Sequence, residues 1–228
     1  MAARQDKAGT GRSESLAARA RRLLEERIVT LKLAPGSWVT EQELSAQIGL
    51  GRTPVREALQ RLIGDGLVVV YPRRGLLIPD INPVDVFQAL DTRVALEQLQ
   101  ARDAALRAKS EERKELLRYA DKMRAFARNG DTDAAARAYM EMDRECDALL
   151  SEASGNPFTA KALEPLQTIS RRAWWRFCRE ADLAPAADLH AALLDAAADG
   201  RADDAASGAQ RLVDHVRAAI RDGVRRGV

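Results

Sequence analysis

The sequence is poor in aromatic residues, cysteine and histidine. Aromatic side chains make up 4% of its 228 residues, whereas hydrophobic residues together make up 46%, many of them alanine and leucine. Such a composition favours helices over β-sandwiches or barrels, because alanine and leucine have high helix propensity. We therefore expect a mainly α protein, long enough to bury a core.

Long apolar runs and cysteine motifs are also missing. No run approaches the roughly 20 apolar residues that a membrane span needs, and the polar start MAARQDKAGTGRSES lacks the apolar core of a secretory signal. The two cysteines, Cys146 and Cys178, form no CxxC pair, which argues against a disulfide framework or a zinc knuckle. We expect both to be buried, no membrane partner and a cytoplasmic protein.

Charge is distributed unevenly although the net charge is only +2. Residues 1–78 hold 13 Lys and Arg against 8 Asp and Glu. The basic excess suggests an anionic partner for this part of the chain, although a solvated surface has the same composition. We expect residues 1–14 to be a flexible basic tail.

Three helices are predicted before residue 66. Apolar residues recur at helical spacing over 15–31, and LAPG ends this helix. Thr40 and Glu43 form a capping-box signal for a second helix, which Gly49 ends. Thr53 is a candidate N-cap with Pro54 at the first position of a third helix, which runs to about Asp65.

Two short β-rich runs follow in LVVVYPRRGLLIP, joined by a turn that contains proline and glycine. They predict a β-hairpin. Three helices followed by a hairpin are typical of a winged helix-turn-helix, which we assign to residues 15–80.

The arginines of the third helix are unfavourable for stability alone. The N-terminal end of a helix carries a partial positive charge, so Arg52 and Arg56 are disfavoured there by roughly 0.3 to 1 kcal/mol each. In a DNA major groove the same helix end is useful, because its N–H groups bind phosphate and guanidinium groups pair with guanine. We expect DNA contacts from this helix and from the hairpin tip: Arg52, Thr53, Arg56, Gln60, Arg73, Arg74 and Gly75.

The stretch LKLAPGSWVTEQELSAQIGLGRTPVREALQRLIGDGLVVVYPRRGLLI resembles the winged-helix domain of the GntR family of bacterial transcription regulators. The RTPVREAL helix, the upstream L-PG and the GLV and RRG pieces of the wing stand in the family's order and spacing. The resemblance implies DNA contacts at Arg52, Thr53, Arg56, Arg74 and Gly75. At Gly51 the family usually has a serine.

Residues 81–228 predict an all-α bundle. A helix begins near Pro83 and keeps helical spacing through Leu99, and further helices are expected at about 110–128, 131–153, 157–179, 186–199 and 202–225. There is no Gly-rich phosphate loop, GxSxG or HExxH motif. We expect a domain for effector binding and dimerisation.

This second part resembles the FCD ligand-binding domain of the FadR branch of GntR regulators, through TRVALE, MDRECDALLSEASGNPF and DLHAALLDAAADG. Many members of that branch bind a metal through Asp-x3-His and two later histidines. Asp143 matches the aspartate, and His190 matches the third ligand. Asp147 stands where the family has the first histidine, and Leu212 stands at the position of the fourth ligand. His215 follows one turn later.

Two interpretations of these positions remain open. Asp143, Asp147, His190 and His215 could hold one divalent ion, Zn, Mn or Ni, in an open site. Alternatively the site is degenerate and the cavity binds its effector through hydrogen bonds and arginine. Arg93 is then the candidate anchor for a carboxylate, unless it only pairs with Glu97.

The patch SRRAWWRFCRE places two tryptophans among cations. Its aromatic side chains either pack between bundle helices or line an effector cavity, and core packing is favoured. We expect Arg171, Arg172 and Arg176 at the polar edge of this patch.

Together these patterns predict a sequence-specific transcriptional regulator rather than an enzyme. We expect a homodimer on a near-palindromic operator and a small effector, such as an organic acid, that modulates binding. The alternative is a metal-dependent enzyme or sensor for small acids, with secondary DNA binding.

Overall fold

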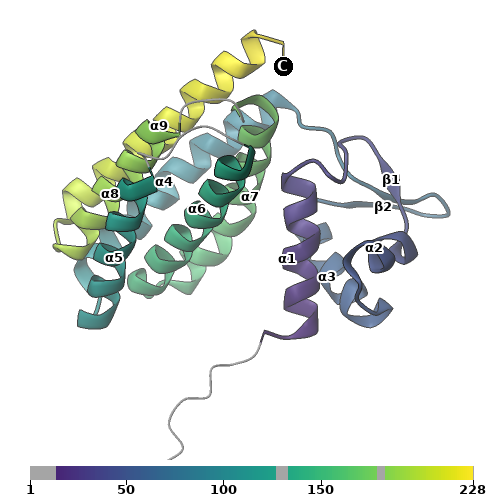
Figure 1. Cartoon of the computed structure of the whole chain (residues 1–228), viewed down its shortest axis with the longest axis horizontal. Coiled ribbons are helices and arrows are strands. Elements are labelled where there is room, and N and C mark those ends of the chain that lie inside the picture. The colour runs from purple at the N-terminus through teal and green to yellow at the C-terminus, as the bar shows by residue number, and fades with distance from the viewer. Residues whose placement is uncertain (1–13, 127–132, 179–182, 228) are drawn as a thin grey trace, which may run out of the picture.

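The computed structural model describes residues 14–126, 133–178 and 183–227. Nearly all of the predicted N-terminal tail therefore lies outside the described residues. Within them the chain is mainly α, with a small antiparallel sheet near the N-terminus (Figure 1). The predicted fold class is confirmed.

The N-terminal part builds three helices: α1 (Leu16–Val29), α2 (Glu41–Ile48) and α3 (Arg52–Gly64). The predicted capping box of α2 is present, because Thr40 Oγ1 accepts from the Glu43 N–H at 3.2 Å and Glu43 Oε2 accepts from the Thr40 N–H at 2.7 Å. Gly49 ends α2 with a φ of 66°, the left-handed conformation in which glycine has no steric cost. The apolar faces of the three helices meet in one core cluster: Ala20, Leu24, Ile28, Leu44, Val55, Leu59 and Leu62.

The sheet has the strand order β1-β3-β2. Its strands are β1 (Trp38–Val39), β2 (Val69–Tyr71) and β3 (Gly75–Leu77). The pairing of β2 with β3 is the predicted hairpin, with Val70 opposite Leu76. β1 was not predicted, because two residues carry no alternating pattern; its pairing with β3 fastens the hairpin to the segment before α2.

The remaining described residues form six helices: α4 (Pro83–Arg107), α5 (Ser110–Phe126), α6 (Asp133–Ser154), α7 (Pro157–Cys178), α8 (Ala184–Ala198) and α9 (Ala202–Arg225). The helix α4 runs beyond the predicted stretch, because Ala101, Ala104 and Ala105 continue its buried face. No strand interrupts this part of the described chain, as predicted. A second core cluster fills the bundle.

Helix α1 lies between the bundle and the other N-terminal elements, and it packs against both α3 and α7 (Figure 1). At the connection to α4, the Arg172 side chain of α7 donates a hydrogen bond to the Pro79 carbonyl. Among the described helices, none combines the length and apolar character that crossing a membrane requires.

Candidate DNA-binding surface and buried charged cluster

The helix α3 begins two residues earlier than predicted, at Arg52 instead of Pro54. Gly51 is its N-cap, in extended conformation, and the backbone is already helical at Arg52. The prediction of Thr53 as N-cap is therefore wrong, and Thr53 occupies the second helical position. Since Gly51 has no side chain that could accept a hydrogen bond, the first-turn N–H groups stay open to an acceptor such as a phosphate.

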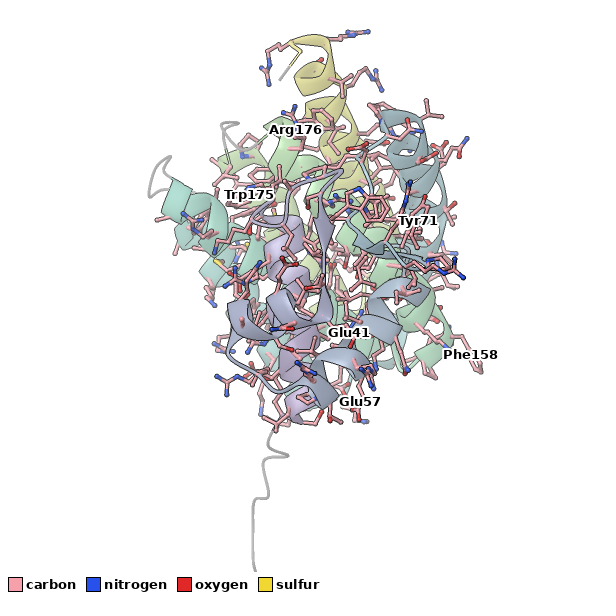
Figure 2. All side chains as sticks on the ribbon, turned by 90° about the vertical axis from the view of Figure 1, so that its right-hand side faces the viewer. Glu41, Glu57, Tyr71, Phe158, Trp175 and Arg176 are labelled. Atoms are coloured by element: carbon pink, nitrogen blue, oxygen red, sulfur yellow. The ribbon has the colours of Figure 1, made fainter. Side chains whose placement is uncertain are left out.

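The four candidate side chains of α3 are all exposed: Arg52, Thr53, Arg56 and Gln60. Figure 2 views the molecule from this side, with Glu41 of α2 and Glu57 of α3 in front of the bundle. Arg56 pairs with the Glu41 carboxylate, which accepts from its Nε at 3.2 Å and its Nη2 at 2.9 Å. An ion pair this exposed contributes little to stability, so a phosphate or base can replace Glu41 easily.

The tip of the β2–β3 hairpin carries the predicted arginines, Arg73 and Arg74, both exposed. The Arg74 N–H donates to the Tyr71 carbonyl at 3.1 Å, and Arg73 has a φ of 66°, the pattern of a type II turn. Gly75 has a φ of 104°, and a Cβ there would lie 3.1 Å from the Val39 carbonyl oxygen. The positive φ and this close contact both favour glycine at position 75.

The strain at Arg73 gives a test of its role. A residue other than glycine at positive φ costs about 1 kcal/mol, so Arg73→Val should lower stability whereas Arg73→Gly should not. Both variants lose the guanidinium, and both should reduce the salt dependence of DNA binding by about one phosphate contact. Thermal unfolding and DNA titration over a salt series measure the two effects. A DNA affinity that followed stability instead of charge would contradict the predicted wing contact.

Inside the bundle, one arginine holds two aspartates together. Arg171 Nε donates to Asp143 Oδ2 at 2.6 Å, and its Nη2 donates to Asp147. The other oxygen of Asp143 lies 3.1 Å from His190 Nε2, and His190 Nδ1 lies 3.0 Å from the Ala186 carbonyl oxygen. The side chains of α6, α7 and α8 thus form one buried charged cluster: Asp143, Asp147, Arg171 and His190.

The cluster changes the acid strength of its members. Burial raises the pKa of Asp147 to about 7, against the opposing effect of Arg171. Burial also acts to raise the pKa of Asp143, but the Arg171 guanidinium and His190 hold it well below its ordinary value. Although burial lowers the pKa of His190, the Asp143 carboxylate raises it above its usual range. An ionised Asp143 therefore favours a charged His190.

The arrangement does not fit a divalent ion held by the four predicted ligands. Asp147, His190 and Leu212 line a cavity of about 10 Å³, barely the size of one water molecule, and His215 does not line it. Arg171 already occupies lone pairs of both aspartates. Within the described ranges, no three His, Cys, Asp or Glu side chains are grouped as metal ligands. Metal occupancy itself stays a prediction, which metal analysis of untagged protein tests.

Arg93, the candidate effector anchor, is buried and already bonded. Its Nε donates to Glu97 Oε1 at 2.6 Å, and its Nη1 donates to Ser170 Oγ at 2.8 Å. The alternative interpretation, a pair with Glu97 one turn away, is thus present. Glu97 and Ser170 thus already occupy donors on two of the three guanidinium nitrogens of Arg93.

Sequence reasoning missed the role of Arg171. It placed Arg171 and Arg172 at a polar edge, whereas both are buried, and only Arg176 is exposed. The pattern within α7 could not reveal this, because the partners Asp143 and Asp147 lie on α6. Which residues of α6 and α7 face each other cannot be read from the sequence of either helix. Core packing of the two tryptophans, Trp174 and Trp175, is confirmed.

Comparison with known proteins agrees with this layout. A profile described as "Bacterial regulatory proteins, gntR family" matches residues 16–78, and one described as "FCD domain" matches residues 88–215. A helix-turn-helix transcriptional regulator from Streptomyces ambofaciens is 43% identical over 74 residues, 32% of this chain and 31% of the relative. The transcriptional repressor RspR of Escherichia coli K12 is 37% identical over 84 residues, 37% of each chain.

The matches to these curated relatives span about a third of each relative's length. Among solved structures, E. coli McbR/YncC superposes with a TM-score of 0.76 at 19% identity, covering 91% of this chain and 98% of the other. At that identity the likeness concerns the fold alone. The two curated relatives are transcriptional regulators, and the two profiles confirm the predicted gntR family and FCD domain.

Proposed function

Because the chain belongs to the gntR family of bacterial regulatory proteins and carries an FCD domain, we propose that it binds one operator sequence specifically and that a small organic acid modulates this binding. The observation that carries the first part is the exposed N-terminal turn of α3. There the Arg52 and Thr53 side chains are exposed and form no hydrogen bond or ion pair with another described residue, and the amides around them lack a capping side chain. These features suit a helix end that meets phosphates and base edges.

A homodimer on a near-palindromic operator is part of the proposal. One copy presents one α3 and one hairpin tip, which is enough for a half-site. Proteins of this class read two half-sites about one DNA turn apart, so the symmetry of the operator reflects that of the dimer. The arginines at the hairpin tip would then contact the minor groove or backbone beside each half-site.

The effector part of the proposal rests on the bundle. Arg93 and Arg171 bring two guanidinium groups into its interior, and such groups bind carboxylates in a bidentate way. Of the partners that neutralise them, Glu97 and Asp143 are buried and Asp147 is only 13% exposed, so the cluster is costly to rearrange. A ligand that rearranged it would shift the packing of α4, α6 and α7 together.

Selection of genomic DNA fragments by the purified full-length protein at physiological salt tests the proposal. We expect one short near-palindrome to be enriched, and a footprint that spans two half-sites. A set of small organic acids is then added to the complex, and at least one should change operator affinity. If the protein bound all fragments alike with steep salt sensitivity, specific regulation by the chain alone would be excluded.

A further inference from the structure

A groove separates the N-terminal part of the molecule from the bundle. Side chains of α1 and α3 line one wall, and side chains of α6 and α7 line the other. Its volume is about 560 Å³, which lies in the range of small-molecule sites. It lies where α1 packs against α7, an arrangement of helices that can be followed in Figure 1.

The carboxylates that line this groove are all paired within the described part of the chain, whereas two of its cations are not. All five of its carboxylates already have partners: Glu14 with Arg22, Glu25 with Arg21 and Thr168, Glu145 with Lys122, Asp147 with Arg171, and Glu164 with Arg21. Two of its cations, Arg61 of α3 and Lys161 of α7, have no ion-pair partner among the described residues. The groove therefore offers two free positive charges, one on each wall.

We propose that this groove binds a small dicarboxylate, with one carboxylate on Arg61 and the other on Lys161. Two separated cations on facing walls suit a ligand with two separated negative charges better than a single anion. The amide groups of Gln100 and Gln167 also line the groove and can donate further hydrogen bonds to the carboxylates.

The inner end of the groove reaches the buried charged cluster, because Asp147 and Arg171 line it as well. This inference rests on the proposed function and identifies both the ligand class and the place of binding. The ligand is held at the junction of the two parts, and Arg93, which does not line the groove, is not its first contact.

Ligand binding here has a direct route to the DNA-binding surface. Arg61 stands next to Gln60 on α3, so a bridge from Arg61 to Lys161 ties that helix to α7. Along α7, Glu164 binds Arg21 and Thr168 binds Glu25, both on α1, and Arg172 binds the Pro79 carbonyl. A further bridge on the same face of α7 would fix the orientation of the N-terminal part, and with it the spacing of two α3 helices in a dimer.

Calorimetric titration of the full-length protein without DNA tests the site. Succinate, glutarate and adipate are the probes, at constant ionic strength, with butyrate and succinamide as controls for charge. We expect saturable binding of at least one dicarboxylate and at least tenfold weaker binding of the two controls. Lys161→Ala and Arg61→Ala should each weaken dicarboxylate binding about tenfold, whereas Arg211→Ala, an exposed arginine on α9 outside the groove, should not.

Absence of saturable binding by all three dicarboxylates would overturn the proposal. So would binding that Lys161→Ala and Arg61→Ala leave unchanged. Operator affinity is measured separately with wild type and Lys161→Ala. If no dicarboxylate bound, but another small acid changed operator affinity equally in both proteins, the groove proposal would fail and the proposed function would stand. If dicarboxylates bound through Lys161 without changing operator affinity, the proposed binding site would be supported, and the proposal that these acids control DNA binding would fail.

Discussion

Replacing Arg171 with methionine should lower the free energy of unfolding by about 3 to 5 kcal/mol, because it leaves Asp143 and Asp147 buried without their common partner. Methionine keeps most of the volume, so the loss is one of charge compensation and not of packing. Urea denaturation at neutral pH measures the effect. Arg176→Met, an exposed arginine on the same helix, is the matched control and should change stability by less than about 0.5 kcal/mol.

The loss should depend on pH in a fixed direction. Loss of the guanidinium removes the charge that most lowers the pKa of both aspartates, so their folded-state pKa values rise relative to the wild type. A buried carboxyl whose pKa is higher in the folded than in the unfolded protein lowers the free energy of unfolding progressively as the pH rises from the unfolded pKa to the folded one. The deficit of Arg171→Met should therefore be larger at pH 8 than at pH 5. Asp143→Asn with Asp147→Asn should restore part of the stability in the Arg171→Met background. An equal deficit at both pH values would mean that the charges do not cause it.

The second large effect concerns DNA. The double variant Arg52→Ala, Arg56→Ala should bind the operator more weakly than the wild type, by on the order of 100-fold or more. The reason is that each guanidinium in contact with a base or phosphate contributes substantially to the binding free energy. Thermal stability should change little, because both side chains are exposed. Fluorescence titration with the selected operator and with a scrambled duplex separates the two kinds of contact.

The comparison of the two DNAs decides what each arginine does. Equal losses on operator and scrambled DNA would assign both arginines to phosphates, whereas a loss confined to the operator assigns them to base edges. Glu57→Ala, on the same helix and exposed, is the control. An unchanged operator affinity of the double variant would remove α3 from the interface.

Much of the fold could be predicted because its signals are local. Helix ends depend on residues close in sequence, such as Thr40 with Glu43, and the hairpin turn depends on Pro72 and Gly75. The N-cap of α3 could not be predicted from such signals, since Thr53 with Pro54 resembles a helix start, whereas the helix begins two residues earlier, after Gly51. The strand β1 exists only because β3 pairs with it.

The buried cluster could not be predicted from local signals at all. Asp143 and Asp147 share a face of α6 by their spacing, and that much is visible in the sequence. Which side chain lies between them depends on the residue of α7 that faces them. The relative axial position of α6 and α7 cannot be predicted from the sequence. The predicted contact of Arg93 with Glu97 is different, because a spacing of four within one helix fixes it.

The absence of a side chain at Gly51 leaves the first N–H groups of α3 without a capping side-chain acceptor. Pro54 contributes no N–H, so the donors at this helix end are few and all point toward the same region. A phosphate placed there would complete the helix in the way that a serine hydroxyl does in an ordinary cap. The end of the helix would then be most ordered when DNA is bound, and Gly51→Ser, by supplying an internal acceptor, would make that order independent of DNA.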